Sequence, residues 1–177
     1  MDKAITIPRR LLEEARRRGV DVESRVAELL SWDLGLNPRE EATIHLELAI
    51  KFLDEARQAI EREDVIQAGE KLYKVAEECI KAMAEALNLS EAHEVRSRGR
   101  WTLRLLDVAA SKLAEKLGRR VYDDWSHAYF LHVEGFHEAR LTINQVKARA
   151  RYIEELLEIT RNTITKPRKP REHYTPG

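Results

Sequence analysis

The sequence is poor in the residues that form disulfides, tight turns and sheets. Its 177 residues include one cysteine, seven glycines and five prolines, and β-branched alternation is nearly absent after residue 7. A single cysteine excludes an intrachain disulfide. No apolar run approaches the roughly 20 residues of a membrane span, and no segment resembles a signal peptide. We therefore expect a cytoplasmic protein that does not enter a membrane.

Amides are also scarce, whereas arginine is abundant. Asn and Gln together number seven, against 21 Arg residues. This balance is typical of thermophilic proteins, which favour ion pairs over labile amides. The single cysteine, Cys79, falls on the apolar stripe of a predicted helix, so we expect a buried and reduced thiol.

Positive and negative charges are equal in number but unevenly distributed. Residues 39–95 carry seven Lys/Arg against 14 Asp/Glu, a net −7, and residues 96–177 carry 17 against 10, a net +7. A basic half could attract a nucleic acid. The two halves could instead attract each other, within one subunit or across a dimer, and we favour this second interpretation.

The N-terminal segment predicts a strand followed by two short helices. Residues 3–8, "KAITIP", alternate as a strand does, and helices are expected over 9–19 and 22–35. This order resembles the ribbon-helix-helix module, in which the strand pairs with its twin. A lone strand leaves its hydrogen bonds unpaired. We therefore predict that residues 1–36 are a dimerisation element and that the protein forms a homodimer or a higher even oligomer.

The rest of the chain is predicted to form an all-α bundle of four to five helices over residues 37–161. Apolar residues recur at helical spacing throughout, and capping patterns such as Asn37-Pro38 with Glu40 mark helix starts. The expected long helices cover residues 37–63, 64–88, 103–117, 119–140 and 142–161. Residues 162–177, with three prolines, are expected to be a flexible basic tail.

Three histidines, His127, His132 and His137, recur at five-residue intervals. On an α-helix of ~100° per residue they point roughly 140° apart, so they cannot share a metal ion, which needs i, i+4 spacing. We predict no metal and no cofactor. His132 is expected on a core-facing aromatic side, neutral and hydrogen-bonded, with Trp125, Tyr129 and Phe136. The opposite, polar stripe contains Arg120, Asp124, His127, Leu131, Glu134 and Glu138.

Three segments carry a family resemblance: "GEKLYKVAEECIKAMAEAL", "RGRWTLRLLDVAASKLAEKLGR" and "WSHAYFLHVEGFHEARL". They resemble the archaeal PaREP family, whose members share a small helical bundle similar to HEPN domains. The resemblance spans about residues 37–160, and "LHVEGFHEARL" is its most specific part. It implies a HEPN-like bundle, to which the N-terminal strand and helix pair are an extension.

The resemblance also implies a candidate ribonuclease site. HEPN domains often cleave RNA with an Arg that is followed, after four to six residues, by a His, usually in a dimer cleft. Arg120 and His127 bracket six residues, "VYDDWS". Together with His137 they are the candidate catalytic residues of a HEPN-type ribonuclease.

Two observations point away from cleavage. With 21 Arg and six His, about two such spacings are expected by chance, and residues 39–45 and 168–173 show the spacing as well. The segment before the last helix, where the motif is expected, has histidines flanking "VEGF" and no arginine. The motif needs a permanent cation to hold the phosphate.

A DNA-binding function is the remaining alternative. In a ribbon-helix-helix strand the outward residues read base edges, and here they would be Asp2, Ala4 and Thr6, which read DNA poorly. We therefore predict first a non-enzymatic interaction or scaffold protein that forms homo-oligomers. An RNA-binding protein or ribonuclease is the alternative, and a DNA-binding regulator is the second alternative.

Overall fold

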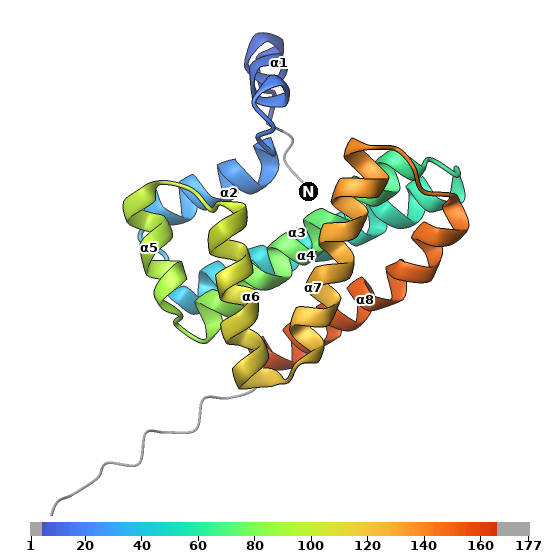
Figure 1. The fold of residues 1–177 in the computed structure, drawn as a ribbon. Helices are drawn as coiled ribbons and strands as arrows, with labels where there is room; N and C mark the ends of the chain where they lie inside the picture. Colours follow the sequence, from blue (N-terminus) through green and yellow to red (C-terminus); the bar gives the residue numbers. More distant parts are fainter. Residues whose placement is uncertain (1–4, 166–177) are drawn as a thin grey trace, which may run out of the picture.

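The computed structural model of the protein describes residues 5–165, and all regular structure in that range is helical. This confirms the all-α prediction. Figure 1 shows a bundle from which the first helix projects. In chain order the elements are α1 (Arg9–Arg17), α2 (Val22–Asp33), α3 (Pro38–Glu61), α4 (Val65–Ala86), α5 (Ser90–Arg98), α6 (Leu103–Leu117), α7 (Arg120–Phe130), the π-helix η1 (Leu131–His137) and α8 (Ile143–Thr165).

The strand expected over residues 3–8 is corrected by the structure. Residues 5–8, the part of it that is described, form no strand, and the chain enters α1 at Arg9. A strand needs a neighbour to satisfy its backbone groups, and residues 5–165 provide none. The N-terminal element is thus two helices. Asp2 and Ala4, which were expected on the outward strand face, lie outside the described residues.

α3 and α4 pack against each other along the bundle, and the helix starts expected at residues 37 and 64 are confirmed. The Asn37 side chain accepts hydrogen bonds from the backbone N–H groups of Arg39 and Glu40, and the Asn37 backbone N–H donates one to the Glu40 carboxylate. Asp64 caps α4 by accepting from the Gln67 backbone at 3.0 Å. These caps satisfy N–H groups that a helix start leaves unpaired, so both helices begin where the sequence predicts.

α4 is the central helix of the bundle. It contacts α3, α5, α6, α7, η1 and α8, and most of its side chains are buried. Cys79 is among them, and burial raises the pKa of its thiol to about 12, so the thiol stays protonated as expected. The largest fully buried side chains of the core include Trp125, Phe52, Leu72, Ile80, Met83 and Ile153.

Three boundaries differ from the sequence predictions. The expected helix over 119–140 is α7 followed by η1, in which hydrogen bonds join residues five apart. α8 continues to Thr165, so residues 162–165 are helical, and the rest of the predicted tail, 166–177, lies outside the described residues. α5 was not predicted, because its nine residues are strongly polar and lack a clear apolar stripe.

Candidate functional site

α2 is oriented with its polar side towards the bundle. Its buried residues are Ser24, Glu28 and Ser31, whereas Leu29 and Leu30 are 46% and 48% exposed. Helices on globular proteins normally turn their apolar face inwards. The usual orientation is therefore inverted in α2: its polar side contacts the bundle, and its leucines face outwards.

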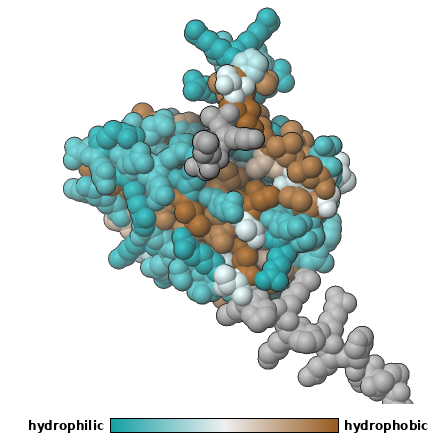
Figure 2. Space-filling model, turned by 180° about the vertical axis from the view of Figure 1, so that it is seen from behind, coloured by the Kyte–Doolittle hydropathy of each residue, from teal (hydrophilic) through white to brown (hydrophobic). Residues whose placement is uncertain are grey.

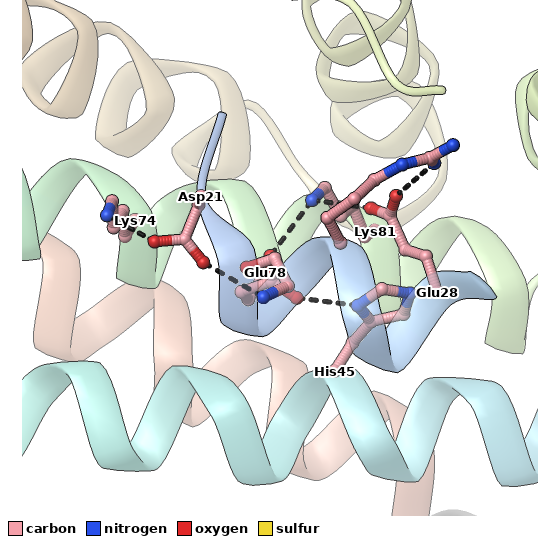
Figure 3. A network of polar contacts seen from close by, with 8 residues as sticks. Asp21, Glu28, His45, Lys74, Glu78 and Lys81 are labelled. Carbon is pink, nitrogen blue, oxygen red and sulfur yellow. Dashed lines mark hydrogen bonds and ion pairs between the residues drawn. The ribbon is translucent and has the colours of Figure 1, made fainter. Parts of the chain in front are cut away.

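The contacts under α2 are ion pairs with lysines of α4 (Figure 3). Asp21, the N-cap of α2, pairs with Lys74, and it also accepts a hydrogen bond from the Ser24 backbone at 2.9 Å. About two turns further along, Glu28 Oε1 lies 2.9 Å from Lys81 Nζ. Asp21 has a lowered pKa: burial opposes the shift, but Lys74 outweighs it. Both acids thus pair with lysines of α4.

The inner end of this network is a buried triad of Lys81, Glu78 and His45. Lys81 Nζ lies 2.9 Å from Glu78 Oε1, and His45 Nδ1 lies 2.6 Å from Glu78 Oε2. All three side chains are at most 6% exposed. Burial acts to raise the pKa of Glu78, but Lys81 and His45 outweigh it and lower the pKa to about 2. The acid is therefore held as a carboxylate inside the fold.

Of the predicted catalytic residues, Arg120 and His127 meet at one ring of α8. The His127 imidazole stacks on Tyr152 with ring centroids 3.9 Å apart, and the Arg120 guanidinium carbon lies 5.2 Å from the same ring centroid. Arg120 also pairs with Asp124, at 3.0 Å, and with Glu155. Two carboxylates thus compete with any phosphate for the Arg120 cation.

The predicted polar stripe of α7 is partly buried. Asp124 of α7 and Leu131 of η1 are both 0% exposed, because α6 and α8 pack against α7 and η1 packs against α4. Burial raises the pKa of Asp124 to about 7, although Arg120 acts in the opposite direction. Neither Asp124 oxygen has a hydrogen-bond partner among the described residues, since the Arg120 contact has poor hydrogen-bond geometry.

The other two histidines meet in η1. His137 Nε2 lies 3.0 Å from His132 Nε2, a contact that the α-helical spacing did not predict. A π-helix joins residues i and i+5 and so brings this pair together. His132 stacks on Tyr73 at 4.0 Å, and burial, followed by His137, lowers its pKa to about 4. His132 is therefore neutral near pH 7 as expected, but its partner is His137. Tyr129, expected beside it, is 43% exposed.

The three candidate catalytic residues are consequently divided between two places. Arg120 and His127 contact Tyr152 on α8, whereas His137 contacts His132 within η1. Among the described residues, no group of three or more His, Cys, Asp or Glu side chains could hold a metal ion. Within the same range, every helix is too short or too polar to cross a membrane.

Sequence reasoning missed two groups of polar residues. Arg149 lies over the exposed Phe130 ring at 4.3 Å, and Arg151 lies over Tyr152 at 4.7 Å while donating to its hydroxyl. The sequence did contain a signal for this group, because basic residues alternate with alanine before Tyr152 in "KARARY", residues 147–152. The ionic network under α2 was also missed. Its signal was the charged series Lys74, Glu78 and Lys81, which recurs at helical spacing on an apolar helix.

Comparisons with known proteins place the bundle in a family. The model of the archaeal PaREP1/PaREP8 family matches residues 44–157. The crystal structure of a protein from Sulfolobus solfataricus is similar, with 33% identity and a TM-score of 0.62, over 66% of this chain and 96% of that chain. A solution structure from the same structural-genomics target has 34% identity and a TM-score of 0.59, over 66% and 91%. No functionally curated protein matches the sequence.

Proposed function

Since this chain belongs to the archaeal PaREP1/PaREP8 family and its first two helices precede the matched residues, we propose that it is a non-enzymatic interaction protein that self-associates through α1 and α2. The bundle that follows is HEPN-like in this proposal and serves as the body to which the two helices add an interface. A homodimer is the simplest assembly, because one patch on each copy then covers the other.

The exposure of apolar side chains on α1 and α2 carries this proposal. α1 buries none of its residues and stands away from the bundle (Figure 1). Leu11 of α1 is 57% exposed and Leu34, which directly follows α2, is 69% exposed, in addition to Leu29 and Leu30 of α2. From behind, Figure 2 shows hydrophobic residues gathered on one face and extending to the base of α1. Contiguous exposed apolar surface of this kind marks interaction sites.

A double substitution in α2 tests the proposal. Leu29→Glu with Leu30→Glu places two carboxylates on the exposed side of α2, so the dimer should dissociate while the bundle stays folded. Each leucine that is covered on association contributes about 1.5–3 kcal/mol, and a buried unpaired carboxylate adds a further cost. Light scattering measures the mass, and circular dichroism checks the helix content.

The matched control is Leu103→Glu on α6, since Leu103 is 45% exposed and lies outside α1 and α2. This variant should keep the mass of the native protein. A monomeric native chain, or a dimer that survives the double substitution unchanged, contradicts self-association through α2.

A second candidate function, binding of single-stranded RNA, is favoured by the surface of α7 and α8. There, Arg149 and Arg151 lie over the rings of Phe130 and Tyr152. Single-stranded RNA is bound by basic grooves whose aromatic and guanidinium planes stack on bases. We propose binding rather than cleavage, because Arg120 is paired with two carboxylates. The DNA-binding alternative depended on the strand and is not carried further.

Salt-dependent RNA binding tests this second candidate. Arg149→Ala with Arg151→Ala should weaken the binding of a single-stranded RNA and reduce the salt slope of log K by about 0.7 for each lost phosphate contact. Fluorescence anisotropy over a salt series measures both quantities. The control is Arg104→Ala, an exposed arginine on α6. No binding by the native protein, or an equal loss in the control, refutes a site on α7 and α8.

A further inference from the structure

Every lysine that α2 contacts is shared between α2 and the bundle. Lys51 pairs with Glu23 of α2 and lies 3.5 Å from Glu55 of α3. Lys74 pairs with Asp21 and lies 3.2 Å from Glu70 of α4. The third, Lys81, pairs with Glu28 and Glu78, each at 2.9 Å. The same arrangement thus occurs three times along one face, which we call the lysine face (Lys51, Lys74 and Lys81).

Because the lysines are shared, detaching α2 from the bundle costs little electrostatic free energy. Breaking a buried ion pair is costly when one charge is left without a partner. Here each lysine keeps a carboxylate of the bundle when α2 leaves, and Asp21, Glu23 and Glu28 enter water. No buried charge is left without a partner, so the ion pairs stabilise the docked α2 but do not strongly oppose its release.

Apolar packing also opposes the release of α2 only weakly. The residues that α2 buries are Ser24, Glu28 and Ser31, and its leucines already face outwards. The apolar side chains of α2 that do face the bundle, Val22, Val26, Ala27 and Trp32, are only partly buried. The hydrophobic effect scales with the apolar surface that is covered, so it holds α2 less strongly than it holds a core helix. The hydroxyl and carboxylate groups that leave the bundle are readily hydrated.

The connections on both sides of α2 suit its transfer to a second copy. α1 has no buried residue and projects from the bundle. Of the two N-terminal helices, therefore, α2 makes the contacts that hold them to the bundle of the same chain. Between α2 and α3 lies a short hinge, residues 34–37, in which Gly35 adopts a φ of 66°. Short hinges of this kind favour the exchange of an element between identical subunits.

We propose that two copies of the chain exchange α2, so that α2 of each copy docks on the lysine face of the other. The inference rests on the self-association proposed above and names its contacts: Asp21, Glu23 and Glu28 of one copy bind Lys74, Lys51 and Lys81 of the second. The exchanged ion pairs are identical to those within one chain. Because the hinges are short, the two exchanged α2 helices lie near the axis of the dimer, and the gain comes from their outward leucines, which cover one another there.

Zero-length crosslinking of isotope mixtures tests the exchange in the full-length native protein. Equal amounts of unlabelled and ¹⁵N-labelled protein are unfolded together, refolded, and treated with a carbodiimide, which joins the carboxylate and the amine of a salt bridge as an amide. Mass spectrometry of the linked peptides then reports which chain supplied each partner. Random pairing of two equal populations makes about half of all dimers mixed, so about half of the Asp21–Lys74 and Glu23–Lys51 links should carry both labels.

The link between Lys112 and Glu91, 2.5 Å apart within the bundle, is the internal control and should always join peptides of one label. Light scattering of the same sample separates the two proposals. A dimer whose Asp21–Lys74 and Glu23–Lys51 links are all of one label overturns the exchange but leaves self-association intact. A monomer overturns both. Mixed labels at Lys74 and Lys51, with one label at Lys112, support the exchange.

Discussion

Replacing Lys81 with methionine should lower the free energy of unfolding by about 3–5 kcal/mol, the cost of removing one member of a buried ion pair. Methionine preserves much of the side-chain volume but lacks the ammonium group. Glu28 and Glu78, which are 5% and 1% exposed, would then lie in the interior without their shared cation. Denaturant unfolding followed by circular dichroism measures the loss.

The same substitution should reverse the way in which Glu78 makes the free energy of unfolding depend on pH in the acid range. In the native protein the pKa of Glu78 is held at about 2, below its ordinary value. Its stabilising contribution is therefore present above about pH 4.5 and is lost as the pH falls towards 2. Without Lys81, only His45 opposes the effect of burial, so we expect that pKa to rise above its ordinary value. The carboxyl group then favours the folded state when protonated, so the variant should gain stability where the native protein loses it.

Lys71→Met is the matched control for this prediction. Lys71 also lies on α4 and pairs with Glu55 at 2.5 Å, but its side chain is 21% exposed and that of Glu55 is 31% exposed. A partly exposed pair contributes about 0–1 kcal/mol, so the control should lose little. Equal losses in the two variants, or an unchanged acid dependence in Lys81→Met, would contradict the buried network.

Replacing Trp125 with alanine should cost about 3–5 kcal/mol, the range for large aromatic residues in a core. Trp125 is 2% exposed, packs on Tyr73 with ring centroids 5.8 Å apart, and donates a hydrogen bond from Nε1 to Asp107 at 3.1 Å. The substitution removes an aromatic contact between α4 and α7 and a polar contact between α6 and α7. Thermal melting measures the change.

Trp101 supplies the comparison, because it is only partly buried at the edge of the same core. Trp101→Ala should cost clearly less than Trp125→Ala. Trp125→Phe should recover much of the loss, since it restores a ring against Tyr73 but not the hydrogen bond to Asp107. A loss as small as that of Trp101→Ala would mean that α7 is held chiefly by other contacts.

Helix positions were determined largely by the sequence, because the signals that start and end a helix are local. Asn37 and Glu40 form the capping pattern that their spacing predicts, and the apolar stripe of α4 correctly placed Cys79 in the core. Local signals failed at residues 131–137, where Gly69 of α4 packs closely against η1. A Cβ atom on Gly69 would lie 3.1 Å from the Leu131 carbonyl oxygen.

The candidate sites depended on contacts between distant segments. The sequence placed Arg120 and His127 on one side of a helix, but not Tyr152, Arg149 and Arg151 from α8 beside them. It likewise showed the charges of Lys74 and Lys81 without the acids, 53 residues earlier, that pair with them.

By itself, then, the sequence determined that this protein is an all-α bundle with two preceding helices, because capping and apolar periodicity act within a few residues. Only the tertiary structure decided which face of α2 meets the bundle and that η1 is a π-helix. The orientation of α2 depends on charges supplied by α3 and α4. The π-helix accompanies a close backbone approach that no local pattern encodes.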